Sequence, residues 1–341
     1  MPPCPFVPAL CSPFRHTSRL GGNAVRGRFL FMTYRDCRCV ADIVREAFDL
    51  VRCDRSHVAD EAVSYYFRGM NHNYDHEGSC AVPCGQITPS IYYKEAWLEH
   101  ESDFFNEALR TYPEEFARDK TTFEILTRMQ HYGYPTRLLD ISAKLTTAMG
   151  FSAATGYDGK NYADLNGFIQ VFRVRNKRIK YGTSDTVTAL SNLARLKSKR
   201  VEVSSACGLR YLEAECKNER AGFFVEEGSE TTKRLMCDIR KVWCVKPMVN
   251  NIRINFQQGE FFLFGCEDDK KCPRATFAEY DYGNPDAPTE GLALIGTMIV
   301  LPRAKKELKE MSEYLDIGEH RLYPDFKHHS SWLKNRYKEE P

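Results

Sequence analysis

The chain has 341 residues, and its 48 Lys and Arg residues nearly balance its 46 Asp and Glu residues, for a formal net charge of +2. Charge alone therefore favours neither nucleic acid nor an anionic membrane as the main partner. Hydrophobic residues make up 43% of the chain, which is enough for a core of its own. The longest apolar runs, such as residues 291–301, are shorter than the roughly 20 residues that span a bilayer, so we expect no membrane partner.

The thirteen cysteines are odd in number, and no secretory signal with a long apolar region precedes them, which indicates reduced thiols in a cytoplasmic protein. Residues 1–31 contain no Asp or Glu and show no apolar period, which predicts a disordered leader. The leader is either an overextended start, with Met32 rather than Met1 as the true first residue, or a flexible tail. An Arg-rich, acid-poor leader is also typical of an organellar transit segment.

Hydrophobic periodicity predicts an α+β fold with central mixed or antiparallel sheets flanked by helices. The expected helices cover residues 40–54, 90–112, 123–132, 145–151, 186–196, 211–219 and 304–314, with a last one about Trp332. The expected strands cover residues 62–68, 137–141, 167–174, 243–247, 259–264 and 293–301. Small polar residues over 71–86 predict a loop.

Arg68 is the first candidate site residue. It stands near the end of the strand over 62–68, where side chains can project into a cleft, and Gly69 after it would let a ligand approach the backbone. The guanidinium offers a fixed fork of donors that suits a phosphate or a carboxylate. Two interpretations stay open: Arg68 clamps a phosphate, or it pairs with an internal carboxylate.

The segment from Gln130 to Asp140 is the most distinctive string, because it gathers His131, Thr136, Arg137 and Asp140 around one turn and one strand. His131 is either a general base or a satisfied core histidine. Arg137 is either a ligand contact or an ion-pair partner of Asp140, and Asp140 can also cap the next helix. Ser142 is expected to cap that helix as well.

Gln258 and Glu260 are two residues apart, so in a strand they would face the same side. A carboxylate beside a ribose can stabilise the positive charge that develops when a glycosidic bond to nicotinamide breaks, which predicts Glu260 as the catalytic group and Gln258 as the residue that orients the acceptor. The alternative is an ordinary exposed strand face with polar residues.

Other site chemistries have little support in the sequence. No Cys-x-x-Cys pair occurs, so we expect no metal. No phosphate-binding P-loop, dinucleotide-binding glycine motif or Gly-x-Ser-x-Gly motif occurs, which argues against ATP, hydride and hydrolase chemistry. Two basic runs, residues 173–178 and 195–200, are either solvated faces or contacts for a nucleic acid.

Several motifs together resemble the FRG domain, a module of bacteria and their phages named for its Phe-Arg-Gly motif. They occur in the family's order: Tyr66-Phe67-Arg68-Gly69, Thr88-Pro89-Ser90, the string from Gln130 to Asp140, Gln257-Gln258-Gly259-Glu260-Phe261 and Tyr323-Pro324-Asp325. The resemblance implies an FRG-type domain over residues 38–330, after the leader and before a terminal helix and tail over 331–341. The sequence departs from the family at Met70 and Ile141, where Gln and an aromatic residue are usual.

A fainter resemblance connects Arg68, Ser142 and Gln258-Gly259-Glu260 with the three motifs of ADP-ribosyltransferases. It implies NAD as a substrate, held by a site of Arg68, Gly69, Thr136, Arg137, Asp140 and Ser142. It also implies that Gln258 and Glu260 transfer ADP-ribose to a protein or nucleic-acid acceptor, as in a toxin or phage-defence effector. The alternative is a non-catalytic module that binds a nucleotide or a nucleic acid.

Overall fold

A computed structural model describes the protein over part of its length. The described residues are 34–58, 62–72, 87–155, 161–197, 203, 205–215, 225–249, 252–268, 270–273, 278–279, 291–324, 329–330, 332–334 and 337. The chain divides into units of residues 1–31 and 32–341, and only the second unit contains described residues. The expected leader and most of the expected loop over 71–86 therefore lie outside the described part.

The described residues form one mixed sheet of nine strands with helices around it, which confirms the α+β class. The strands are β1 Tyr34–Cys37, β2 Val63–Met70, β3 Leu138–Ser142, β4 Gly167–Arg175, β5 Ile179–Tyr181, β6 Val242–Lys246, β7 Gly259–Phe264, β8 Ala278–Glu279 and β9 Leu292–Val300. Their order is β1-β9-β4-β2-β3-β7-β6-β5, and β8 pairs with β9. The pairs β1–β9, β5–β6 and β8–β9 are parallel, and the others are antiparallel.

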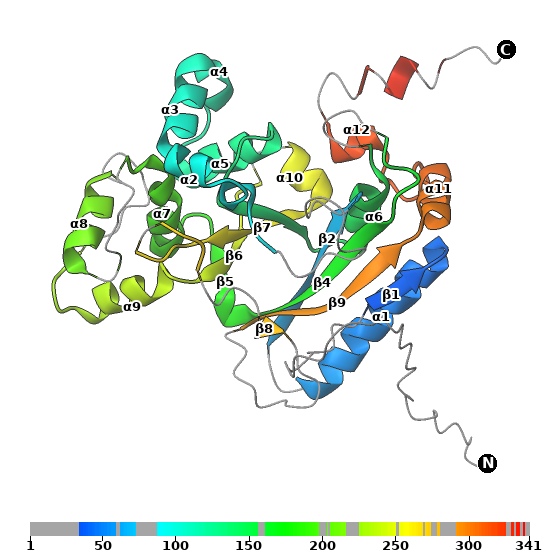
Figure 1. Ribbon diagram of the computed structural model, residues 1–341, viewed down its shortest axis with the longest axis horizontal. Helices are drawn as coiled ribbons and strands as arrows, with labels where there is room; N and C mark the ends of the chain where they lie inside the picture. The colour runs from blue at the N-terminus through cyan, green and yellow to red at the C-terminus, as the bar shows by residue number, and fades with distance from the viewer. Residues whose placement is uncertain are drawn as a thin grey trace, which may run out of the picture. The chain divides into compact units, whose positions relative to one another are not determined.

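The sheet is folded at the junction between β2 and β3. This junction divides it into a first half-sheet of β1, β9, β4 and β2 and a second half-sheet of β3, β7, β6 and β5. Strand β2 pairs with β4 along its whole length, but it meets β3 at one residue pair, Phe67 with Ser142. Across this junction the rings of Phe172 on β4 and Phe262 on β7 lie 5.2 Å apart. Because a flat sheet would separate these strands by three spacings, or about 14 Å, the two half-sheets must fold toward each other (Figure 1).

The inner faces of the half-sheets enclose one of the apolar cores. Tyr66, Phe172 and Leu294 come from the first half, and Ile141 and Phe262 come from the second. Strand alternation turns every second residue toward this core, so the inner face is fixed for each strand. Tyr66, Arg68 and Met70 of β2 face inward, as do Glu260, Phe262 and Phe264 of β7.

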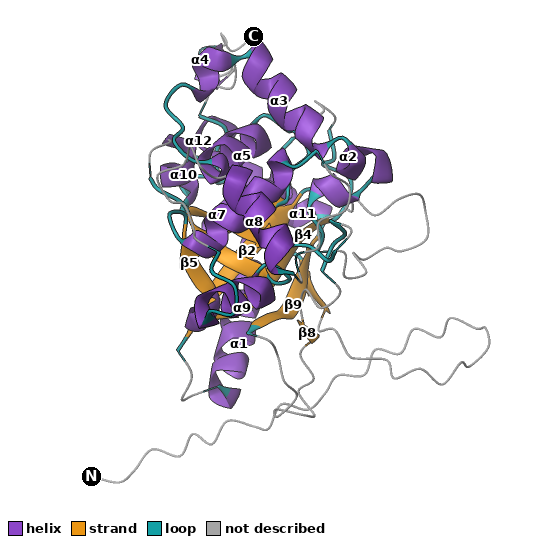
Figure 2. Cartoon of the chain, turned by 90° about the vertical axis from the view of Figure 1, so that its left-hand side faces the viewer, coloured by secondary structure: helices purple, strands orange, loops and turns teal. Residues whose placement is uncertain are grey.

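Helices cover the two outer faces. Helices α1 Val40–His57, α6 Leu145–Ala153 and α11 Pro302–Glu310 pack on the outer face of β9, β4 and β2. On the second half-sheet the covering helices are α3 Glu101–Thr111, α4 Pro113–Phe116, α5 Thr122–His131, α7 Asp185–Asn192, α8 Ala206–Glu215 and α9 Glu230–Asp238. Figures 1 and 2 show α7, α8 and α9 gathered beside β5 and β6. No described helix is long and apolar enough to cross a membrane.

Most predicted elements are confirmed to within a few residues, but the helix predicted over 90–112 is wrong. It is three pieces: a 3₁₀ turn over Ser90–Tyr92, α2 Glu95–Glu99 and α3. The backbone is extended at Lys94 and leaves the helical range at His100. These breaks turn Tyr92 and Glu101 inward, where both contact Arg137.

The structure also contains elements that the periodicity did not predict. Residues between β6 and β7 form α10 Ile252–Gln257, and α12 Glu319–Leu322 packs near it. The cap predicted at Ser142 is wrong, since Ser142 ends β3 and Lys144 is the N-cap of α6. Helix α5 shows why its start was predictable: Thr121 and Glu124 form a reciprocal capping box.

Candidate functional site

Glu260 lies on the inner face at the start of β7, and its side chain is 14% exposed. The thiol of Cys244 donates to its Oε2 at 3.4 Å, and Lys246 Nζ lies 3.9 Å from Oε1. Burial raises the pKa of the Glu260 carboxyl, while Tyr66, Lys246 and Cys244 oppose the shift. The result is a mostly buried carboxylate beside a thiol and an ammonium group of β6, with Tyr66 of β2 stabilising its charged form.

Arg68 stands two residues after Tyr66 on the same face of β2. Its Nη1 donates to Gln170 Oε1 at 3.3 Å and contacts the thioether sulfur of Met70. Among the described residues no carboxylate lies within ion-pair distance of Arg68. The described part therefore gives no support to the internal ion pair, and it leaves the guanidinium facing the same interior as Glu260.

Gly69 faces the other way and serves the packing of β2. A Cβ at this position would lie 2.0 Å from the backbone oxygen of Ala148 in α6. Any side chain here would push the helix off the strand, so the glycine permits close contact between α6 and β2. The space beside Gly69 is occupied by this helix rather than open to a ligand.

Thr136 and Asp140 lie on the outer side of the second half-sheet and join it to α5. Gln130 at the end of α5 donates from Nε2 to Asp140 at 2.7 Å and accepts from the Thr136 hydroxyl at 2.5 Å. One amide thereby joins α5 both to the residues before β3 and to the middle of β3. These contacts give the dense string of polar residues a scaffolding role.

Arg137 is fully buried and pairs with Glu101, not with Asp140. Its Nε and Nη2 donate to the two Glu101 oxygens at 2.5 and 2.6 Å, and Nη1 reaches Tyr92 Oη at 2.8 Å. Lys270 Nζ lies 3.0 Å from the same carboxylate. Burial opposes the charge of Arg137, but Glu101 and Tyr92 outweigh it and hold the arginine pKa above its usual value.

Ser142 and Gln258 both lie apart from the inner face of the sheet. Because Ile141 points inward, Ser142 points outward, and its hydroxyl donates to the Gln257 carbonyl at 2.6 Å. Gln258 precedes β7 with a φ of 41°, in the left-handed region. The expectation that Gln258 and Glu260 share a strand face is therefore wrong, since a turn replaces the strand periodicity at Gln258.

His131 is a buried residue at the end of α5. Burial lowers the pKa of its imidazole to about 3, and the nearby charges of Arg253 and Arg128 act in the same direction. A histidine with this pKa is neutral throughout the physiological range and is poorly matched to general-base work there. The core-histidine interpretation fits this environment better.

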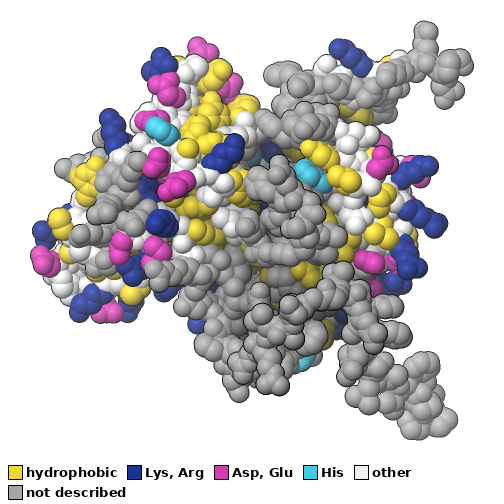
Figure 3. Space-filling model, viewed as in Figure 1, with side chains coloured by type: hydrophobic (Ala, Val, Ile, Leu, Met, Phe, Trp, Pro, Cys, Tyr) yellow, Lys and Arg dark blue, Asp and Glu magenta, His cyan; other side chains and the backbone are white. Residues whose placement is uncertain are grey.

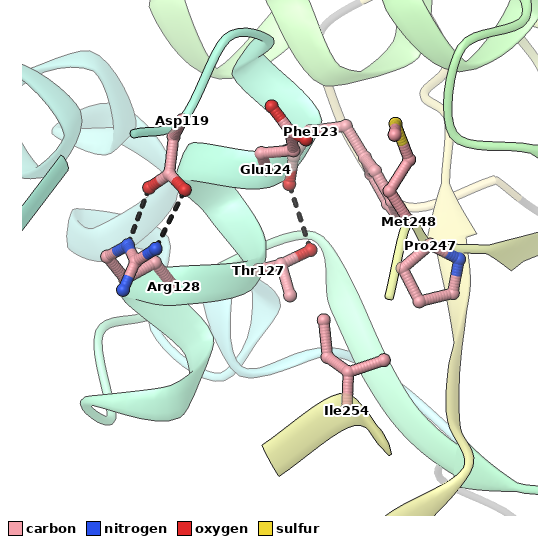
Figure 4. Close-up of a pocket in the computed structure, with 8 residues that line it drawn as sticks. All are labelled: Asp119, Phe123, Glu124, Thr127, Arg128, Pro247, Met248 and Ile254. Atoms are coloured by element: carbon pink, nitrogen blue, oxygen red, sulfur yellow. Dashed lines mark hydrogen bonds and ion pairs between the residues drawn. The ribbon is translucent and has the colours of Figure 1, made fainter. Parts of the chain in front are cut away.

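A shallow pocket opens elsewhere, between α5, α10 and the residues after β6. Its lining is Asp119, Phe123, Glu124, Thr127, Arg128, Pro247, Met248 and Ile254. Figure 4 shows the Asp119–Arg128 ion pair at one end and apolar side chains at the other. Phe123 packs against Phe261, which points to the outer face, so this pocket lies on the opposite side of β7 from Glu260.

The first basic run is largely internal. Arg173 pairs with buried Asp54 at 3.1 Å, and buried Arg178 lies over the Trp243 ring at 5.1 Å. On the visible face of the described part, acidic and basic side chains are interspersed (Figure 3). Within the described ranges no group of three His, Cys, Asp or Glu residues is arranged to hold a metal ion.

The comparison with protein families gives one match. Residues 63–160 match the family model of the FRG domain. The chain contains an FRG domain. The FRG match includes Arg68 and the string from Gln130 to Asp140, while Glu260 lies outside it. No curated protein and no solved structure matches the chain.

The inner face also brings in residues that the sequence arguments passed over, namely Tyr66, Cys244, Gln170 and Thr297. A usable signal existed for three of them. Thr297 interrupts the otherwise apolar strand Leu292–Val300, and Gln170 interrupts the apolar alternation of Phe168, Phe172 and Val174 in strand Gly167–Arg175. Each lies at an inward position, where a polar group needs a partner or a function. Tyr66 could be found from the alternation that places it beside Arg68.

Proposed function

We propose that this FRG-domain protein cleaves NAD and transfers ADP-ribose to a protein or nucleic-acid acceptor, as a toxin or phage-defence effector does. The carrying observation is Glu260: a mostly buried carboxylate on the inner face of β7, whose charged form Tyr66 of β2 stabilises, with Arg68 two residues farther along β2. One interior face thus presents a mostly buried carboxylate and a cation without a carboxylate partner among the described residues, the two groups that the proposed reaction uses.

The chemistry needs both groups. When the bond between ribose C1′ and the nicotinamide nitrogen breaks, its electron pair leaves with nicotinamide and positive charge develops on the ribose. An ionised Glu260 beside the ribose would stabilise that charge. Arg68 would bind a phosphate of NAD. The acceptor nucleophile then forms the new bond to C1′ and releases its proton to solvent.

Glu260 must be ionised for this role. Its pKa is raised by burial, so the ionised fraction at neutral pH depends on the opposing donors, among them Lys246 at 3.9 Å. We expect the rate of nicotinamide release to rise with pH through the raised pKa of Glu260. A variant Lys246→Met would shift this rise to higher pH because it removes one opposing charge.

The test is release of nicotinamide from NAD by the purified protein, with and without bacterial lysate as a source of acceptors. Glu260→Gln keeps the shape of the side chain and is expected to lower the rate at least about 100-fold, as the loss of a transition-state charge partner does. Glu227→Gln is the control, because Glu227 is an exposed carboxylate that pairs with Arg210. Equal rates in the parent and Glu260→Gln would contradict the proposal.

The alternative is a module that binds a nucleotide on the same face without cleaving it. Arg68 supports this alternative as well, since an arginine without a carboxylate partner among the described residues suits either function. Binding of NAD without any release of nicotinamide, in the presence of lysate, would establish it. Nucleic-acid binding through residues 173–178 has less support, because Arg173 and Arg178 are buried.

A further inference from the structure

Arg68 belongs to a polar row that crosses three strands. The strand register sets Arg68 of β2 opposite Gln170 of β4, and Gln170 opposite Thr297 of β9. All three side chains face inward. Apolar residues border the row on both sides: Phe172 and Leu294 belong to the inner core, while Phe168 and Ile299 pack with Met70. A row of hydrogen-bonding groups between two apolar layers needs an explanation that core packing does not supply.

Thr297 is the most informative member of this row. It is 1% exposed, and its hydroxyl is buried without a hydrogen-bond partner among the atoms of the described residues. A buried hydroxyl without a partner costs stability, and a valine of nearly the same shape would avoid the cost. Gln170, also 1% exposed, uses its oxygen for Arg68, which leaves its amide N–H groups as donors.

We infer that Arg68, Gln170 and Thr297 form one subsite for a phosphate or diphosphate group, in which the Thr297 hydroxyl donates to a phosphate oxygen. A guanidinium, an amide and a hydroxyl supply donors of the kinds that bind phosphate. The Met70 thioether now contacts Arg68 Nη1 and would move aside when an oxyanion binds, which suits a flexible methionine side chain. The inference rests on the proposed function and assigns the diphosphate of NAD to this row.

The test uses equilibrium binding of ADP-ribose and inorganic pyrophosphate, with adenosine and nicotinamide as probes that lack phosphate. Thr297→Val is expected to weaken binding of both phosphate probes about 10-fold or more, the loss of one hydrogen bond to a charged group. Thr297→Ser keeps the hydroxyl and should bind them like the parent. Because valine removes an unpartnered hydroxyl, the melting temperature of Thr297→Val should equal or exceed that of the parent, whereas a structural role would lower it.

Thr188 provides a matched control. It is 2% exposed, its hydroxyl is likewise buried and unpartnered among the described residues, and it lies on α7 against the outer core. Thr188→Val should leave binding of ADP-ribose unchanged. Gln170→Leu gives an independent variant of the row and should weaken the same two probes even if Thr297→Val does not fold.

The outcomes separate this inference from the proposed function. If the parent releases no nicotinamide but binds ADP-ribose in a way that depends on Thr297 and Gln170, the transferase proposal is wrong and the subsite stands. If the parent cleaves NAD while Thr297→Val and Gln170→Leu bind both phosphate probes normally, the subsite is wrong. Absence of any binding of ADP-ribose and pyrophosphate by the parent would also overturn it.

Discussion

Arg68 and Arg137 each belong to a distinctive motif at a strand, Arg68 within β2 and Arg137 directly before β3, but the structure surrounds them differently. Arg137 is fully buried just before β3, where Glu101 accepts two of its hydrogen bonds and Lys270 adds a second cation. Arg68 faces the interior of the folded sheet, and its described partners are a neutral amide and a thioether. The charge partner, rather than the density of the motif, separates a scaffold arginine from a candidate ligand arginine.

The largest effect is expected at Glu101, the ion-pair partner of Arg137. Glu101→Gln would leave Arg137 and Lys270 buried without their carboxylate, and we expect the free energy of unfolding to fall by about 3–5 kcal/mol. Urea denaturation measures it. Glu107→Gln on the same helix is the control, because Glu107 forms only an exposed pair with Arg110 and its loss should be small. Similar losses in both variants would contradict the assignment.

The second prediction tests whether His131 is a structural residue, through the pH dependence of stability. Its pKa is lowered to about 3 in the folded protein, so the unfolded chain binds a proton first as the pH falls below 6.5. The stability that the neutral imidazole contributes is complete above pH 6.5 and is lost between there and about 3, on the order of 1 kcal/mol per pH unit. Unfolding curves at pH 8 and pH 5 should show a smaller loss for His131→Gln than for the parent.

Glu260 should show the opposite dependence. Its folded pKa is raised, so the folded protein binds a proton more tightly than the unfolded chain does. Stability from this group is therefore present below its ordinary pKa of 4.5 and is lost as the pH rises through the raised value. Glu260→Gln does not titrate, so its stability relative to the parent should increase with pH over this range. A constant difference would show that the folded protein does not perturb Glu260.

The smallest effect is expected at Arg68. Since no described carboxylate depends on it, Arg68→Met should lower the free energy of unfolding by only about 1 kcal/mol, the cost of leaving the Gln170 oxygen without its donor, in contrast to Glu101→Gln. Chemical denaturation of both variants side by side makes the measurement. A loss at Arg68 as large as that at Glu101 would mean that Arg68 is also an internal ion-pair residue.

Much of this arrangement could be predicted locally. The β7 strand was predicted with its exact bounds, and alternation along β2 would place Tyr66 and Arg68 on one face. The fold of the sheet could not be predicted, because it depends on a junction of one residue pair, Phe67 with Ser142. The pairing of Arg137 with Glu101 spans 36 residues, and Glu101 follows a break at His100 within a helix predicted as continuous. Neither long-range contact leaves a periodic signal.

The close spacing of the polar residues from Gln130 to Asp140 suggested a ligand site, but in the structure these residues bind one another and neighbouring elements. Gln130, Thr136 and Asp140 bond to one another, and Arg137 reaches Glu101 from the same turn. Polar residues gathered around one turn predict either a ligand site or a buried network, and sequence alone does not separate them. The two cases are distinguished by identifying the partner of each donor and acceptor in the structure.

The most direct test of the central claim, that the inner face is the ligand face, is the change in melting temperature that ADP-ribose causes in the parent and in Arg68→Met. A ligand that binds only the folded state raises the melting temperature. We predict a rise in the parent that is lost in Arg68→Met, although the two unliganded proteins melt at similar temperatures. The same rise in both proteins, or none in the parent, would contradict the claim.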